Sequence, residues 1–114
     1  MNGNYILNGK LQMTDDETGE FEIVTETGTV NVSKILDNIF DSSLRPQAYI
    51  KILRGNAFIF EEDGLITFCR DKQGVESYMI CGMNLSKLLW DNTEERLDIC
   101  IKKRGNISKY GNIS

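Results

Sequence analysis

The stretch NVSKILDN at residues 31–38 recurs as NLSKLLWDN at residues 84–92. Recurrence of this kind indicates that a structural unit has been duplicated. In the first stretch and just beyond it, apolar residues follow the spacing of one helical face, namely Val32, Ile35, Leu36, Ile39 and Phe40. The second stretch repeats the beginning of that pattern with Leu85, Leu88 and Leu89. The two stretches therefore predict two amphipathic helices that begin at equivalent positions.

The similarity continues on both sides of the predicted helices. Four glycines ahead of them correspond in pairs, which are Gly9 with Gly64 and Gly19 with Gly74. The segment 21–24 matches 77–80, and 49–53 after the first helix matches 97–101 after the second. Apolar residues in these segments tend to alternate with polar ones, which is typical of half-buried strands. The sequence thus predicts the element order strand–strand–helix–strand, given twice.

Three clusters of acidic residues and glycine predict turns. Residues 15–19 and 71–74 each separate the first two strands of a unit. Residues 61–64, which end in Asp-Gly, predict a hairpin turn between a linking strand at 56–60 and a returning strand at 65–69. Under this interpretation the linking strand joins the two units.

We therefore predict an α+β fold with a mostly antiparallel sheet and two short helices on one face. Internally duplicated ββαβ units, at about residues 5–53 and 64–103, would be related by a pseudo-two-fold axis within a single domain, residues 1–103. A strongly curled sheet approaching a barrel is the alternative. The polar tail, residues 104–114, contains Gly-Asn-Ile-Ser twice and is expected to be flexible or swapped onto a partner chain.

Composition sets the expected compartment. No apolar run approaches the ~20 residues of a membrane span, and the first residues lack the basic and apolar regions of a signal peptide. We therefore expect a cytoplasmic protein that does not interact with membranes. Three cysteines form no disulfide framework, and we expect buried, reduced thiols at Cys69, Cys81 and Cys100.

The residue inventory argues against most catalytic chemistry. The chain has no histidine, so it lacks the usual general base and the commonest metal ligand. It also lacks the glycine-rich motifs that bind nucleotide phosphates. The carboxylate clusters at 15–17 and 61–63 are expected to be solvated turn residues. We predict a protein that is not an enzyme and uses no cofactor or metal.

The repeated helix starts suggest one possible ligand. A helix N-terminus presents free amides and a partial positive charge, which suit an anion. A nucleotide-like ligand with two phosphates would fit two such sites, and the residues predicted to bind it are Asn31, Ser33, Lys34, Asn84, Ser86 and Lys87. The same residues also fit ordinary helix capping, with the asparagines or serines accepting the first amides and the lysines in solvent.

Charge and aromatic residues suggest a protein partner instead. Residues 1–41 carry eight acids against two lysines, whereas residues 99–114 carry four cations and no acid. An acidic surface attracts a basic partner and can mimic nucleic acid. Trp90, one position past the apolar stripe, would be an aromatic anchor. The residues predicted to bind a protein are Asp15, Asp16, Glu17, Glu20, Glu22 and Trp90.

The short, acidic, histidine-free chain with a duplicated unit resembles the small proteins of phages and mobile elements. That resemblance implies an inhibitor of a host protein, such as a nuclease or another defence protein, or a protein that sequesters a small molecule. We rank the protein-binding inhibitor first, the binder of a nucleotide-like anion second and a structural, oligomerising subunit third. A homodimer or higher oligomer fits all three. The few cations at 102–104 do not favour a nucleic-acid ligand.

Overall fold

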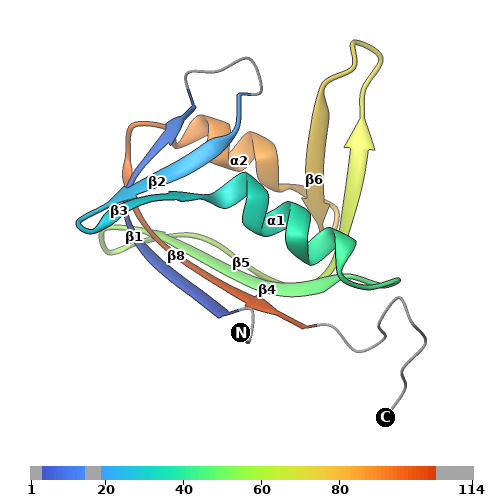
Figure 1. Cartoon of the computed structure of the whole chain (residues 1–114), viewed down its shortest axis with the longest axis horizontal. Coiled ribbons are helices and arrows are strands. Elements are labelled where there is room, and N and C mark those ends of the chain that lie inside the picture. Colours follow the sequence, from blue (N-terminus) through green and yellow to red (C-terminus); the bar gives the residue numbers. More distant parts are fainter. Residues whose placement is uncertain (1–3, 15–18, 105–114) are drawn as a thin grey trace.

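The computed structural model describes residues 4–14 and 19–104, which form a small α+β fold. Figure 1 shows its ten elements. In chain order they are β1 (Asn4–Met13), β2 (Phe21–Thr25), β3 (Gly28–Asn31), α1 (Val32–Asp41), β4 (Gln47–Arg54), β5 (Ala57–Arg70), β6 (Glu76–Ile80), β7 (Met83–Asn84), α2 (Leu85–Asp91) and β8 (Arg96–Lys103). Three strands, a helix and a strand thus follow one another twice, whereas the predicted unit had two strands, a helix and a strand.

The eight strands form one sheet in the order β3-β2-β1-β8-β4-β5-β6-β7. Every neighbouring pair is antiparallel, as predicted for most of the sheet. The long strands β1 and β5 each change neighbour along their length. β1 pairs with β8 over residues 4–10 and with β2 over 10–13. β5 pairs with β4 over 57–65 and with β6 over 66–70.

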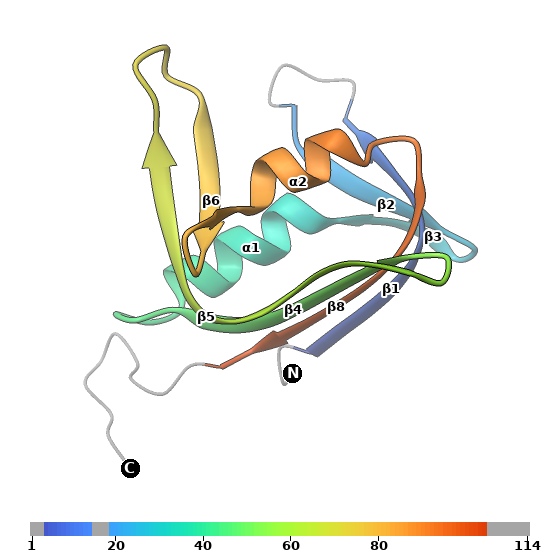
Figure 2. The same cartoon turned by 180° about the vertical axis from the view of Figure 1, so that it is seen from behind.

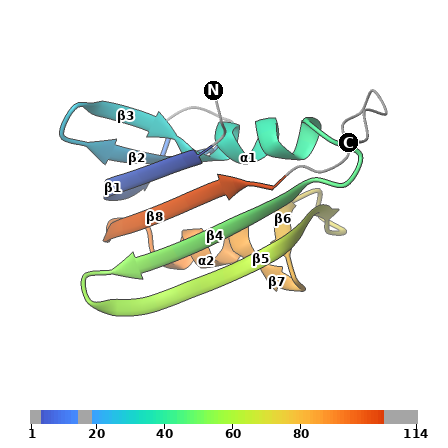
Figure 3. The same ribbon diagram turned by 90° about the horizontal axis from the view of Figure 1, so that it is seen from below.

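These changes of neighbour divide the sheet into three parts. The central part contains β1, β8, β4 and β5, which lie side by side in Figure 3. At each side, the end of a long strand leaves the central part and continues into an arm. The first arm contains β2 and β3, and the second contains β6 and β7. In Figures 1 and 2, β6 and the end of β5 stand nearly upright from the central part.

A glycine lies where each long strand changes neighbour. A Cβ added to Gly9 would lie 2.1 Å from the carbonyl oxygen of Val24 on β2, and one added to Gly64 would lie 2.5 Å from Cys81 Sγ. Other side chains would therefore collide with the approaching segment at both positions. The matched glycines of the sequence thus allow the arm to pack closely against the strand.

The predicted turn at residues 61–64 is wrong. The linking strand 56–60 and the returning strand 65–69 belong to the single strand β5, which pairs with β4 without a break at 61–64. Gly64 serves close packing, whereas the hairpin turn lies at Gly55, which has a φ of 63°. The predicted turn at 71–74 does separate β5 from β6, and the residues 15–18 of its counterpart lie outside the described ones.

Both predicted helix starts are confirmed. Asn31 Oδ1 accepts a hydrogen bond from the amide of Lys34, and Asn84 Oδ1 accepts one from the amide of Lys87, each at 2.8 Å. These are N-cap interactions, which satisfy amides that lack a partner within the helix. The apolar faces of both helices cover the concave face of the sheet. They contribute Val32, Ile35, Leu36, Ile39, Leu85 and Leu89 to the buried core.

Neither helix of the described residues covers the opposite, outer face of the central strands (Figure 3). Side chains on β8 alternate accordingly, because Leu97, Ile99 and Ile101 are buried and Asp98 is exposed. The expectation of three buried thiols is wrong, because none of the three cysteines lies under the helices. Cys100 lies half-buried on the outer face, while Cys69 and Cys81 are exposed in the second arm and its turn. Neither helix in the described part of the chain has the length and apolar character needed to cross a membrane.

Candidate functional site

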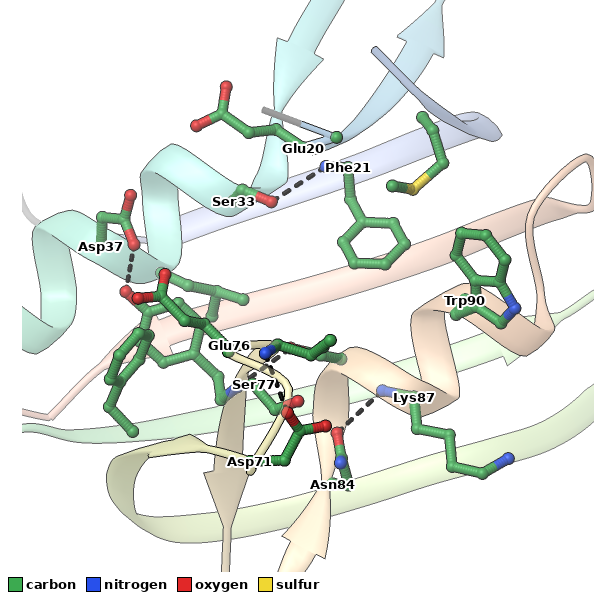
Figure 4. Close-up of a pocket in the computed structure, with 18 residues that line it drawn as sticks. Glu20, Phe21, Ser33, Asp37, Asp71, Glu76, Ser77, Asn84, Lys87 and Trp90 are labelled. Carbon is green, nitrogen blue, oxygen red and sulfur yellow. Dashed lines mark hydrogen bonds between the residues drawn. The ribbon is translucent and has the colours of Figure 1, made fainter. Parts of the chain in front are cut away.

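A cleft of about 870 Å³ lies between the two helices and the two arms. Figure 4 shows the side chains that line it. The first half of the chain supplies Met13, Gly19, Glu20, Phe21, Ser33, Leu36 and Asp37. The second half supplies Phe68, Asp71, Gly74, Val75, Glu76, Ser77, Tyr78, Asn84, Ser86, Lys87 and Trp90. Both halves therefore contribute to one concave surface, whose volume is in the range of small-molecule sites.

Negative charge dominates this surface. Four carboxylate residues line it, namely Glu20, Asp37, Asp71 and Glu76. The one cation among the lining residues is Lys87, whose Nζ lies 3.0 Å from a carboxylate oxygen of Asp91 on the same helix. Asp91 thus partly neutralises that ammonium group. Glu76 is likewise paired with Arg70, so Glu20, Asp37 and Asp71 are the lining carboxylates that form no ion pair among the described residues. This surplus of negative charge favours a positively charged group.

The carboxylates are held in position by the protein itself. Glu20 Oε1 accepts a hydrogen bond from Asn31 Nδ2 at 3.0 Å, and Asp71 Oδ1 accepts from the amides of Gln73 and Val75. Glu76 forms an ion pair with Arg70. Because these contacts orient the carboxylates before any ligand arrives, less ordering remains to be done on binding.

The second arm closes one end of the cleft by contacting α1. The Tyr78 hydroxyl donates a hydrogen bond to the carboxylate of Asp37. The Tyr78 ring also packs edge-on against Phe68 and Phe40, with centroids 5.3 Å and 5.8 Å away. Burial and the hydrogen bond to Asp37 raise the pKa of Tyr78 well above its usual value. The hydroxyl thus remains a donor at neutral pH and fastens the arm to the helix.

Among the described residues, no comparable contact closes the other end of the cleft. Trp90 on α2 lies across the cleft from Asp37 in Figure 4 and is 60% exposed. Asp37 and Trp90 each stand six residues after the N-cap asparagine of their helix. The half-buried ring of Phe21 also faces the cleft. An apolar surface next to carboxylates is therefore available at this end.

The residues predicted to bind an anion are only partly together. Ser33, Asn84, Ser86 and Lys87 line the cleft, whereas Asn31 and Lys34 do not. The serine hydroxyls already accept hydrogen bonds, Ser33 from the amide of Phe21 and Ser86 from the amide of Tyr78, each at 2.9 Å. They join the first turn of each helix to the arm strand beside it. This contact was absent from the sequence interpretation, which treated the serines as possible caps.

The residues predicted to bind a protein are also divided. Glu20 and Trp90 line the cleft. Glu22 lies outside it and accepts a hydrogen bond from Gln12 at 2.7 Å. Asp15, Asp16 and Glu17 lie outside the described residues. Asp37 belongs to the acidic segment 1–41 but was not singled out, and Asp71 and Glu76 lie far from that segment in sequence. Only the fold brings these three carboxylates together in the cleft.

Among the residues that the structure describes, no group of three cysteine or carboxylate side chains has the geometry of a metal site. Comparison with protein-family models finds no matching family, and neither a curated protein nor a solved structure gives a significant match.

Proposed function

We propose that this protein is a non-catalytic binding module whose cleft receives a basic segment of a partner protein. The observation on which the proposal depends is the combination of four carboxylates with an exposed tryptophan in one concave surface. Carboxylates favour lysine and arginine, and Trp90 offers a face for cation–π contact or apolar packing. Tryptophan is also among the residues that contribute most to binding energy at interfaces.

The proposed role is inhibition. A partner that uses a basic surface to bind nucleic acid loses that function when the surface is covered by an acidic protein. A nuclease or another defence protein of a host would be such a partner, which agrees with the resemblance to small phage and mobile-element proteins. The cytoplasm is the proposed location.

A nucleotide-like anion is the alternative ligand. Ser33, Asn84, Ser86 and Lys87 favour it because they line the same cleft. The surrounding carboxylates oppose it, and the caps and serines already use their acceptor groups within the protein. The balance therefore favours the basic protein segment.

We further propose that the two halves are duplicated units related by a pseudo-two-fold axis. Exchanging β1–β4 with β5–β8 turns the strand order into its own reverse, which is what such an axis requires. The changes of neighbour at Gly9 and Gly64 and the serine contacts of the two helices also correspond under this exchange. The cleft would then lie on the axis, and it would be made asymmetric by Asp37 in one half and Trp90 in the other.

The chain supplies its own probe for this function, because Trp90 is its single tryptophan. We expect its fluorescence to change when a synthetic peptide rich in arginine and containing one phenylalanine is added. A peptide with glutamate in place of each arginine is expected to leave it unchanged. Binding should weaken with added salt, because the attraction is between charges.

Two matched pairs of variants locate the binding. Glu20→Gln removes a charge from a residue that lines the cleft, and Glu22→Gln removes one from a similar half-buried residue that does not. Glu20→Gln is expected to weaken binding about two- to fivefold, and Glu22→Gln to have less effect. By calorimetry, Trp90→Ala should weaken binding about 30-fold, whereas Phe58→Ala, at a site 61% exposed on β5, should not. Equal effects within each pair would refute the cleft as the binding site.

The same titration tests the alternative ligand. If a cyclic dinucleotide, rather than the basic peptide, alters the fluorescence and Lys87→Ala abolishes its effect, the anion is the ligand and the proposed function is wrong.

A further inference from the structure

The central part of the sheet has two strand edges with no neighbouring strand among the described residues. Residues 5–8 of β1 pair with β8 and with no other strand of the described residues, because β2 joins β1 from Lys10 onward. On the other side, residues 57–65 of β5 pair only with β4, because β6 joins β5 from Ile66 onward. Edges of this kind expose backbone hydrogen-bonding groups that readily pair with another strand.

The β1 edge lacks the features by which proteins normally protect an edge. Its segment YILN at residues 5–8 contains no charged residue and no proline, and its pairing with β8 has no bulge. Ile6 lies in the middle of the segment and is 85% exposed, more than any other large hydrophobic residue described. The terminal strands β3 and β7 have only four and two residues, so they offer much shorter edges.

The backbone geometry shows which groups of β1 point outward. Leu11 donates to the carbonyl of Glu95 and accepts from the amide of Glu94, so its polar groups face the β8 side. These directions alternate along a strand. Leu7 therefore directs its amide and carbonyl toward β8, while Ile6 and Asn8 direct theirs toward the open edge.

We propose that β1 pairs antiparallel with β1 of a second copy of this chain, with Ile6 opposite its own counterpart across a two-fold axis. Such an isologous contact closes after two copies. It would join the two central sheets into one, and it would bring the two exposed Ile6 side chains together on the outer face. This dimer interface is separate from the cleft, which lies on the concave side, so it does not depend on the proposed function.

Charge favours this pairing over one between two β5 edges. The β5 edge carries Glu61, Glu62 and Asp63, and two such edges side by side would place like charges together. The turn at Cys81 also approaches β5 at Gly64 and narrows access to that edge. The uncharged β1 edge has neither obstacle.

The oligomeric state of the full chain tests the proposal. Light scattering after gel filtration is expected to give twice the chain mass of 13.0 kDa at high protein concentration and a lower mass on dilution. Ile6→Lys would place two ammonium groups together at the axis, and we expect the dissociation constant to rise at least about 100-fold. Because Ile6 is exposed, the variant should keep the melting temperature of the wild-type monomer.

Phe58→Lys is the matched control, since it introduces the same charge at an exposed apolar site on the β5 edge. It should leave the dissociation constant unchanged. Hydrogen exchange adds a readout of the backbone, because the Ile6 amide should gain protection as concentration rises while the Leu7 amide stays protected throughout.

Several results would overturn the proposal. One is a single mass of one chain up to about 1 mM. Another is a dimer that survives Ile6→Lys or that dissociates on Phe58→Lys. A third is a series of growing oligomers, which would indicate head-to-tail pairing of β1 with β5. A monomer that dimerises only after removal of residues 105–114 would assign the edge to the chain's own tail instead.

Discussion

Replacing Tyr78 with phenylalanine should loosen the second arm while leaving its packing intact. The change removes only the hydroxyl that donates to Asp37, and the ring contacts with Phe40 and Phe68 remain. A hydrogen bond contributes about 0.5–1.5 kcal/mol to stability, and more with a charged acceptor. Tyr78 is only partly buried, so solvent screening reduces that gain. We therefore expect the free energy of unfolding to fall by about 1 kcal/mol, equivalent to about 4 °C in melting temperature.

Tyr49→Phe is the control for this experiment. Tyr49 also donates to a carboxylate, that of Glu61, but it lies on the open outer face of the sheet. Removing the Tyr49 hydroxyl should lower the free energy of unfolding less than Tyr78→Phe does. Combining Tyr78→Phe with Asp37→Ala in a double-mutant cycle should give a coupling energy of about 0.5–1 kcal/mol. Additive effects, or equal losses for the two tyrosines, would refute the role of this contact in fastening the arm.

The same residue predicts a pH dependence. The pKa of Tyr78 is raised in the folded protein, by burial first and then by its bond to Asp37, whereas an unfolded tyrosine titrates near 10. The folded state therefore holds the proton at pH values where the unfolded state loses it. This contribution to stability is complete below about pH 10 and is lost as pH rises toward the folded pKa. Denaturant titrations above pH 10 should show a shallower decline for Tyr78→Phe than for the wild type.

Three further predictions concern the N-cap asparagines, the glycines where the long strands change neighbour, and the Cys81 thiol. Asn31→Ala and Asn84→Ala should each lower the free energy of unfolding by about 1 kcal/mol, measured by urea titration; no loss at either site would contradict its role as an N-cap. Gly9→Ala should destabilise the fold by about 2 kcal/mol or more and by more than Gly64→Ala, because its Cβ would meet a backbone carbonyl rather than a side-chain sulfur; the reverse order would be evidence against this explanation. Desolvation and a hydrogen bond with Glu62 raise the pKa of the Cys81 thiol. Cys81 should therefore react more slowly with a disulfide reagent at pH 8 than an unperturbed cysteine. Glu62→Gln should accelerate this reaction, and an unchanged rate would rule out that carboxylate as a cause.

Local patterns in the sequence were enough to predict the helices and most strand segments. The stripe beginning at Val32 fixed which face of α1 is buried, and the asparagines marked where both helices begin. The Asp-Gly at residues 63–64 misled because turn chemistry and close strand packing both select glycine. Only the neighbour of Gly64, the sulfur of Cys81 from 17 residues further along the chain, decides between the two. That neighbour belongs to the tertiary structure, so local reasoning could not identify it.

The candidate site was harder to predict for a related reason. Repeated residues in the sequence pointed to Asn31, Ser33, Asn84 and Ser86, yet these positions perform the same structural task in both halves. The residues that give the cleft its character are those at which the halves differ. Asp37 stands where the second helix has Trp90, and Tyr78 on β6 occupies the position relative to Ser86 that Phe21 on β2 occupies relative to Ser33.

Those differences make the two ends of the cleft unlike each other. Where Asp37 meets Tyr78, a polar contact closes the cleft. At the equivalent positions in the other half, Trp90 and Phe21 offer two aromatic rings and cannot form that contact. If the two halves had the same residues at these positions, the cleft would have either two closed ends or two open ones. Substituting Trp90→Asp together with Phe21→Tyr would recreate the closing pair at the open end. We expect this double variant to fold and to lose affinity for the basic peptide, although it gains a negative charge. Retained or stronger binding would show that charge alone recruits the peptide and that the aromatic opening is not required.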